Sequence, residues 1–360
     1  MKHMNWFSAL LVIGLSGSPA LALDDAAAKA VMAKAVDLYI RPAYTDFHQK
    51  SEALAVETGK LCQKPSGTQL SEVSDRFAEV ISSWAKIEFL RDGPVMQENR
   101  FERIVFYPDR KSTGLKQVQA LLAEPDETAT DPLQLRNRSV AIQGLGAFEF
   151  AFFGLYPEGL TGEAQSFRCR YGLAIARNVE AIAGELEAAW DDPNGIQKAW
   201  KAPSADNPVF RNEAEAVQAL IGLHVHGAEM VRDQRIKAFY KGKAGKLAPK
   251  SAIFWRSANT THSIAGNIEG LAELWKKSDM SSLLSEDVRS LADSVEFDYV
   301  SALGAARKLD QPTAERLADP KYIARLDFIE LNLKDAITRI NNDVGGAVGL
   351  GAGFSFADGD

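Results

Sequence analysis

The chain has 360 residues, enough for two compact domains. Its 46% hydrophobic and 25% charged residues are typical of a globular protein. The net charge of −7 argues against nucleic acid or an anionic membrane as the main partner, because both attract a basic surface.

The first residues have the features of a cleaved secretory signal, in the usual order. Lys2 and His3 precede an apolar stretch over residues 6–15, which is too short to span a bilayer. The sequence Ala-Leu-Ala at 20–22 then provides the small residues that a signal peptidase reads. We predict a signal peptide over 1–22, cleavage after Ala22 and export to the periplasm; the alternative is a buried N-terminal helix. No later segment has the apolar length of a transmembrane helix.

Two cysteines, Cys62 and Cys169, remain after export. An oxidising compartment favours a disulfide over two free thiols or a thiolate metal site. The spacing alone does not fix the pairing, so the disulfide is a prediction from the compartment.

Apolar residues at three- and four-residue steps predict helices through nearly the whole mature chain. The expected helical segments are 25–60, 71–89, 96–106, 113–123, 137–153, 164–190, 210–240, 258–277, 284–308 and 313–341. Pro42 should kink or divide the first of them, since proline removes a backbone donor. We find no alternating strand pattern of useful length, and therefore predict an all-α fold of two antiparallel helical bundles packed side by side.

A stretch without helical periodicity separates the two expected bundles. Residues 191–208 hold three prolines, two asparagines and a glycine, which is typical of a linker. We predict an N-terminal bundle over 23–192, a linker over 193–208 and a C-terminal bundle over 209–360.

The segment 139–154 carries the clearest functional signal. It is strongly apolar and contains one ionisable residue, Glu149. A buried carboxylate is costly unless it finds a cation, a ligand or a wet cleft. Gly144 and Gly146 in the same expected helix each cost about 1 kcal/mol relative to alanine, which indicates that something approaches the backbone there. The alternative is a helix-packing notch beside a salt-bridged glutamate.

The same segment resembles the GxHxxE motif of the imelysin family, here Gly144-Leu145-Gly146-Ala147-Phe148-Glu149. Further stretches resemble that family in the same order: Trp84, Arg91-Asp92-Gly93-Pro94, Phe106-Tyr107-Pro108-Asp109, Trp255-Arg256-Ser257, Asn267-Ile268-Glu269-Gly270-Leu271 and the tail from Gly353 to Asp360. The resemblance spans nearly the whole mature chain. It implies two helical bundles with a shared cleft, and a link to the uptake of iron, haem or other metals.

The family was first described as metallopeptidases, with the His and Glu of the motif as proposed metal ligands. In this chain the His position is Gly146, which has no side chain to ligate a metal. Glu149 alone is a poor transition-metal site, and zinc hydrolysis needs about three protein ligands. His224 and His226 lie two apart, so on a helix they point to nearly opposite sides. The sequence has no HExxH or CxxC motif, and we expect a binding protein rather than an enzyme.

The cations most suited to face Glu149 are Arg91 and Arg256, which could pair with a carboxylate or hold an anionic ligand; the alternative is that each only ties helices together. Ser257 can cap a helix, and free backbone donors beside it would suit an anion. The predicted ligand-binding residues are Gln143, Gly144, Gly146, Glu149, Arg91, Arg256, Ser257 and Asp358, the last brought near the cleft if the tail folds back.

The leading functional hypothesis is a periplasmic binding protein for iron, haem or another metal complex, with its ligand in the cleft between the bundles. A divergent metallopeptidase is the second hypothesis. A scaffold for an outer-membrane or inner-membrane uptake component is the third.

Overall fold

The computed structural model describes residues 23–154, 157–242 and 245–351. In these ranges the chain is helical and contains no strand. The α-helices are α1 (Asp25–Lys34), α2 (Arg41–Gln63), α3 (Gly67–Ile87), α4 (Arg100–Ile104), α5 (Thr113–Ala123), α6 (Pro132–Leu135), α7 (Leu145–Phe153), α8 (Phe167–Asp191), α9 (Ile196–Lys201), α10 (Glu213–Glu229), α11 (Thr260–Lys277), α12 (Ser290–Ala306), α13 (Pro320–Thr338) and α14 (Gly345–Ala347). None of the described helices is both long and apolar enough to cross a bilayer. The expected signal peptide and Asp358 lie outside the described residues.

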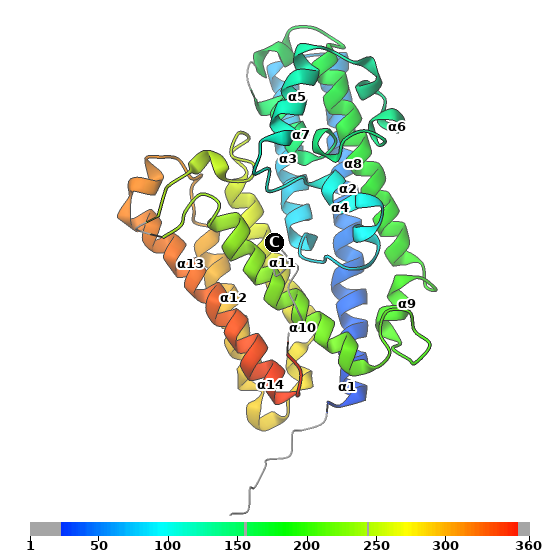
Figure 1. Ribbon diagram of the computed structural model, residues 1–360, viewed down its shortest axis with the longest axis vertical. Coiled ribbons are helices and arrows are strands. Elements are labelled where there is room, and N and C mark those ends of the chain that lie inside the picture. Colours follow the sequence, from blue (N-terminus) through cyan, green and yellow to red (C-terminus); the bar gives the residue numbers. More distant parts are fainter. Residues whose placement is uncertain (1–22, 155–156, 243–244, 352–360) are drawn as a thin grey trace, which may run out of the picture.

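The long helices form two groups that pack side by side, as Figure 1 shows. In the first group α2 packs against α3 and α8, and α7 packs on α8. In the second group α12 packs against α11 and α13, while α10 contacts both α11 and α13. The predicted all-α fold of two helical bundles is therefore confirmed.

The two bundles are joined over a broad surface. Helix α3 packs along α11, and α1, at the very start of the described chain, packs against α10. The expected linker over 193–208 contains the short helix α9, whose Trp200 is buried and lies edge-on to Trp190 and to Phe210. Trp200 thus packs the proline-rich stretch against Trp190 near the end of α8 and against Phe210, just before α10.

The first predicted helix is divided before Pro42, as expected. Residues 35–40 form a π-helical segment, and Pro42 lies in the first turn of α2. The residue before α2 is itself helical, and the Arg41 N–H donates to the Val36 carbonyl, so the proline, which has no N–H to donate, follows directly on a π turn. The wider π turn lets α1 and α2 run on without a loop between them.

The apolar segment around Glu149 begins its helix later than predicted. A 3₁₀ turn spans residues 140–142, and α7 begins only at Leu145, with Gly144 as its N-cap. The backbone carbonyls that a longer helix would use are bound by side chains instead. Gln143 Nε2 donates to the carbonyl of Arg138 (2.7 Å), and the Tyr171 hydroxyl donates to that of Ile142 (2.6 Å).

A disulfide joins Cys62, near the end of α2, to Cys169, in the first turn of α8. The predicted pairing is confirmed. Both cysteines are buried, so the bond joins the C-terminal end of α2 to the N-terminal end of α8 inside the core of the first bundle.

Candidate functional site

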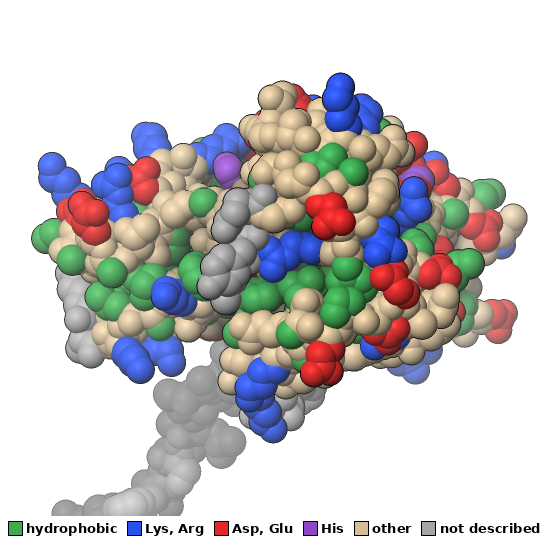
Figure 2. Space-filling view, turned by 90° about the horizontal axis from the view of Figure 1, so that it is seen from above, with side chains coloured by type: hydrophobic (Ala, Val, Ile, Leu, Met, Phe, Trp, Pro, Cys, Tyr) green, Lys and Arg blue, Asp and Glu red, His purple; other side chains and the backbone are tan. Residues whose placement is uncertain are grey.

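A cavity of about 970 Å³ lies between the two bundles. Its walls come from residues 105–118 up to the first turns of α5, residues 140–150 around the start of α7, residues 233–242 and 250–256 between α10 and α11, and Glu330 of α13. Seen from above, basic and apolar side chains lie next to one another where the surface is hollowed between the two parts of the molecule (Figure 2). This volume suits an organic ligand, whose pockets range over about 300–1,000 Å³, and far exceeds the space that one ion needs.

Glu149 lies in the wall of this cavity and is 4% exposed. Its Oε1 accepts three hydrogen bonds, each 2.9 Å long: from the backbone N–H of Arg256, from the backbone N–H of Ser257 and from the Ser257 hydroxyl. Burial raises the pKa of Glu149 above its ordinary value, and the hydrogen bonds from Ser257 and the charge of Arg256 oppose that rise. The carboxyl group therefore joins α7 of the first bundle to the loop before α11 of the second.

That loop, residues 254–258, has an unusual backbone. Phe254 (φ 54°) and Ala258 (φ 56°) both adopt left-handed conformations, which cost energy in residues that carry a Cβ. The compensating contacts are visible: Phe254 is buried edge-on to Phe77 of α3 (6.1 Å between centroids), and Asn259 donates from its backbone N–H to the Phe254 carbonyl (2.9 Å). Glu149 supplies the remaining acceptor for the N–H groups at the tip of the loop.

The two glycines of the motif have different surroundings. A Cβ at Gly144 would lie 2.4 Å from the carbonyl oxygen of Ile104, so this glycine allows two backbone segments to approach closely. A Cβ at Gly146 would meet nothing within 4 Å, and Gly146 lines the cavity. The position where the family motif has histidine is therefore open space in this chain.

Arg256 lies at the cavity wall with its side chain among aromatic rings. Its guanidinium carbon is 4.5 Å from the centroid of the Trp255 ring and 5.1 Å from that of Phe150. Lys250 approaches Trp255 as well, with Nζ 5.6 Å from the ring centroid. All four residues line the cavity. The charge of Arg256 also acts on Glu149 through space, although the two meet through the Arg256 backbone N–H rather than through the guanidinium.

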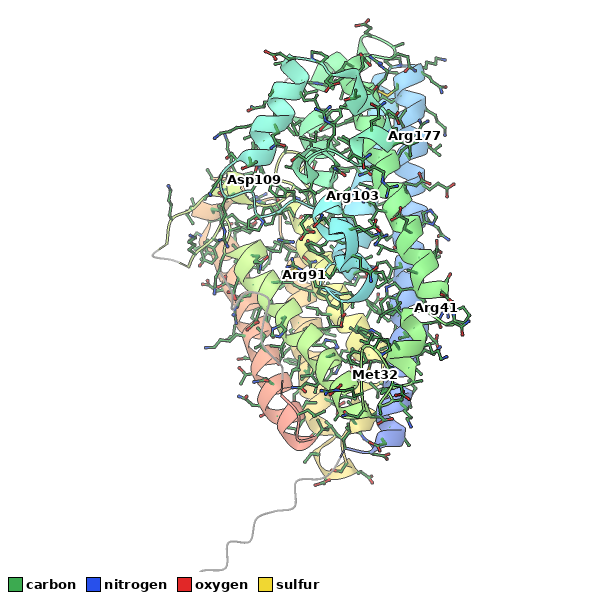
Figure 3. The ribbon with its side chains drawn as sticks, turned by 45° about the vertical axis from the view of Figure 1, so that its right-hand side comes forward. Met32, Arg41, Arg91, Arg103, Asp109 and Arg177 are labelled. Atoms are coloured by element: carbon green, nitrogen blue, oxygen red, sulfur yellow. A yellow bond between two sulfur atoms is a disulfide. The ribbon has the colours of Figure 1, made fainter. Side chains whose placement is uncertain are left out.

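The predicted residue Gln143 is fully buried and lies behind the cavity wall. Its Oε1 accepts from Arg103 Nε (3.1 Å), and Arg103 Nη2 donates to Asn178 (3.0 Å). Arg103 is labelled in Figure 3 beside α8. Gln143 thus holds a buried arginine and the turn before α7, and the structure gives it no contact with the cavity.

Arg91 is likewise placed away from Glu149, and Figure 3 shows it well apart from Asp109, which lines the cavity. Its guanidinium carbon lies 4.2 Å from the centroid of the Phe101 ring. Burial lowers the pKa of Arg91, the carboxylate of Glu88 raises it, and the neighbouring Arg235 lowers it further. Glu88 and Arg235 form a fully buried ion pair, so Arg91 belongs to a charge cluster between α3 and α10 that the sequence did not reveal.

The histidine pair does not act as one chelating unit. His224 is fully buried against Trp275, and burial lowers its pKa to about 3, whereas His226 contacts Glu229 (3.1 Å) on the other side of α10. The residues present do not fit a metal ion bound in the manner of the family motif, because position 146 has no side chain and Glu149 already serves three donors. Nor do the described residues include any group of three or more His, Cys, Asp or Glu side chains placed to hold a metal ion.

Sequence reasoning did not single out several residues of the cavity wall. They are Tyr107, whose hydroxyl donates to the Ser251 carbonyl (3.0 Å), the lysines at 237, 241 and 250, and Trp255. Tyr107 and Trp255 stand inside stretches that resemble the family. The lysines form a visible run in residues 237–250, but only the folded chain brings that run to the same hollow as α7.

The fold and the cavity define a helical protein of two joined bundles with a ligand-sized hollow between them. The imelysin family model matches residues 40–339, and the chain belongs to the imelysin family.

Two solved structures share the fold. An imelysin-like protein from Psychrobacter arcticum 273-4 superposes with a TM-score of 0.75 at 19% identity, covering 93% of this chain and 100% of that one. An iron-regulated protein A precursor from Parabacteroides distasonis ATCC 8503 superposes with a TM-score of 0.71 at 14% identity, covering 89% of this chain and 96% of that one. No curated protein is significantly similar in sequence.

Proposed function

We propose that this protein is an exported binding protein that takes up an iron-containing complex or haem in the cavity between its bundles. The observation that carries the proposal is the cavity itself: about 970 Å³, with the tied loop 254–258 in its wall. A hollow of this size accommodates an organic ligand or a metal complex, and a carboxylate maintains one wall. The histidine that the family motif offers as a proposed metal ligand is Gly146 here, and the space beside it is open.

Iron enters the proposal through the family. The structure from Parabacteroides distasonis is described as an iron-regulated protein, and this chain shares its fold. We propose that iron is the cargo of this chain. The iron would arrive within a complex, so the protein need not supply a complete set of ligands.

Export to the periplasm is supported by two features. The sequence before Leu23 has the order of a signal peptide. The disulfide between Cys62 and Cys169 is of the kind that persists in an oxidising compartment. N-terminal sequencing of protein released by osmotic shock should begin at Leu23, and retention of residues 1–22 in the cytoplasmic fraction would contradict export.

The binding role is tested by titrating the purified mature protein with ferrous, ferric and zinc ions and with haemin. We expect saturable binding of the complex and weak binding of the bare ions. Gly146→Trp is the matched blocking variant, because its side chain enters open space in the cavity instead of the core. It should weaken binding at least tenfold with no loss of thermal stability. Unchanged binding in this folded variant would remove the cavity as the site.

A further inference from the structure

We infer that the cavity binds its ligand as an organic anion with a flat conjugated face, held by Lys250, Arg256 and Trp255, while Glu149 positions the loop and does not contact the ligand. This inference rests on the proposed function, since it takes the cavity to be the binding site. It names the chemistry of the ligand and changes the role that the sequence suggested for Glu149.

The acidic side chains of the cavity wall are already engaged or buried. Asp109 accepts backbone N–H groups at the start of α5 (2.6 and 3.2 Å), and Asp233 pairs with Lys237 (2.6 Å). Glu149 serves three donors of the loop. Burial raises the pKa of Glu330, which favours its neutral form. Neutral donors leave the charges of Asp109 and Glu149 in place, but the oxygens that they occupy are no longer free to bind a ligand cation.

Three basic side chains of the cavity wall have no acidic partner. Lys241, Lys250 and Arg256 line the cavity, and no ion pair joins any of them to a carboxylate in the described part of the chain. The wall holds five basic side chains against four acidic ones, and cations without an acidic partner in low-dielectric surroundings attract ligands of the opposite sign. The protein as a whole carries a net charge of −7, so this local excess of positive charge is a property of the site rather than of the surface in general.

Two of these cations lie over one aromatic ring. The Trp255 ring has Arg256 at 4.5 Å and Lys250 at 5.6 Å from its centroid, and the same guanidinium lies 5.1 Å from the centroid of the Phe150 ring. The half-buried indole and the planar guanidinium over it give the cavity wall flat conjugated surfaces, and the cations can reach acidic groups at the edge of a flat ligand. A flat conjugated molecule with peripheral carboxylates satisfies both features at once.

Glu149 makes this arrangement possible without touching the ligand. Its three hydrogen bonds fix the backbone of Arg256 and Ser257, and this backbone carries the Trp255 ring and the guanidinium into the wall. The proposed ligand contacts come from Trp255 and Arg256 of the loop and from Lys250 just before it, whereas Glu149 acts as a positioning residue.

The charge requirement is tested with three probes that share one ring system: haemin, iron-free protoporphyrin IX, and haemin dimethyl ester, which keeps the iron but loses both carboxylates. We expect haemin and protoporphyrin IX to bind with similar affinity and the ester at least tenfold more weakly. Raising the salt concentration should weaken the two acids and leave the ester unaffected, since screening acts on charged pairs.

The residue assignment is tested with variants of the cations. Lys250→Gln and Arg256→Gln should each weaken haemin binding about tenfold, and Lys250→Arg should retain most of the affinity. Lys276→Gln is the matched control, because Lys276 is an exposed lysine of α11 outside the cavity (side chain 74% exposed). Trp255→Leu should weaken all three probes, the ester included, because it removes the aromatic surface that they share.

The outcomes separate the inference from the proposed function. Equal binding of haemin and its ester, or unaltered affinity in both glutamine variants, would overturn the inference while leaving cavity binding of an iron complex in place. If protoporphyrin IX binds and no iron compound does, the inference stands and the role in iron uptake fails. If none of the three probes binds, the inference is overturned for this class of ligand.

Discussion

Replacing Glu149 by alanine should release the loop over residues 254–258. The substitution leaves two backbone N–H groups without their acceptor, whereas the Ser257 hydroxyl can still donate to the Phe254 carbonyl (3.3 Å); a buried donor left unpaired costs about 1–3 kcal/mol. Two effects offset part of this cost. Removal of the carboxyl abolishes the penalty for burying its charge, and water from the adjacent cavity can reach the freed donors. We expect a net loss of about 1–3 kcal/mol in the free energy of opening the loop.

Hydrogen exchange at the Arg256 and Ser257 amides measures this opening directly. Because each 1.4 kcal/mol is a factor of ten, Glu149→Ala should accelerate exchange at both amides roughly 5- to 150-fold, with little change at amides in α2 or α12. Glu149→Gln keeps one acceptor oxygen and should accelerate exchange less. If both amides in Glu149→Ala exchange as slowly as in the wild type, Glu149 does not anchor the loop.

The ionisation of Glu149 adds a dependence on pH. Its folded pKa is raised by burial, so the folded state disfavours the charged form. The group therefore stabilises the fold fully below its unfolded pKa of about 4.5, and that contribution is lost as the pH rises through the folded value. Relative to Glu149→Gln, the wild type should lose stability over this window, as measured by urea unfolding at a series of pH values. A constant difference between the two proteins would contradict the assignment.

Three further predictions concern the scaffold around the site. Gly144→Ala should destabilise the protein by about 2 kcal/mol or more, because its Cβ would overlap the Ile104 carbonyl. Gly146→Ala should be neutral or stabilising by up to about 1 kcal/mol. Equal melting temperatures for the two variants would contradict this contrast. Reducing the disulfide, or replacing both of its cysteines by serine, should cost about 2–4 kcal/mol because the bond closes a long loop, and a reduced protein that melts at the same temperature would refute it. Burial lowers the pKa of His224 to about 3, so its contribution to stability is present above about pH 6.5 and is lost as the pH falls toward 3. His224→Phe should flatten this part of the profile of stability against pH. An unchanged profile would count against a buried neutral His224.

Local patterns in the sequence were sufficient for most of the helices. The three- and four-residue steps of apolar side chains gave the long helices, and Pro42 marked the division between α1 and α2. The late start of α7 depends on contacts that periodicity does not contain. Gly144 must fit against the carbonyl of Ile104. The Tyr171 hydroxyl, 29 residues after Ile142, donates to the Ile142 carbonyl, which a longer helix would use.

The candidate site was predictable where a local rule applied. Glu149 stood out because a lone acid in an apolar helix needs a partner, and the structure gives it three hydrogen-bond donors. The position of Arg91 depends on Glu88, just after α3, and on Arg235, in the π-helical segment after α10, so spacing in the sequence could not reveal it. Lys237, Lys241 and Lys250 look like part of a solvated run until the fold brings these three to the cavity.

The most direct test of the account is a crystal structure of the mature protein with haemin bound. We expect density for the ring in the cavity between the bundles, stacked on Trp255, with its carboxylates within hydrogen-bonding distance of Lys250 or Arg256 and with Glu149 still bound to the loop. A ligand seated on the outer surface with the cavity unfilled, or one coordinated by Glu149 itself, would contradict it.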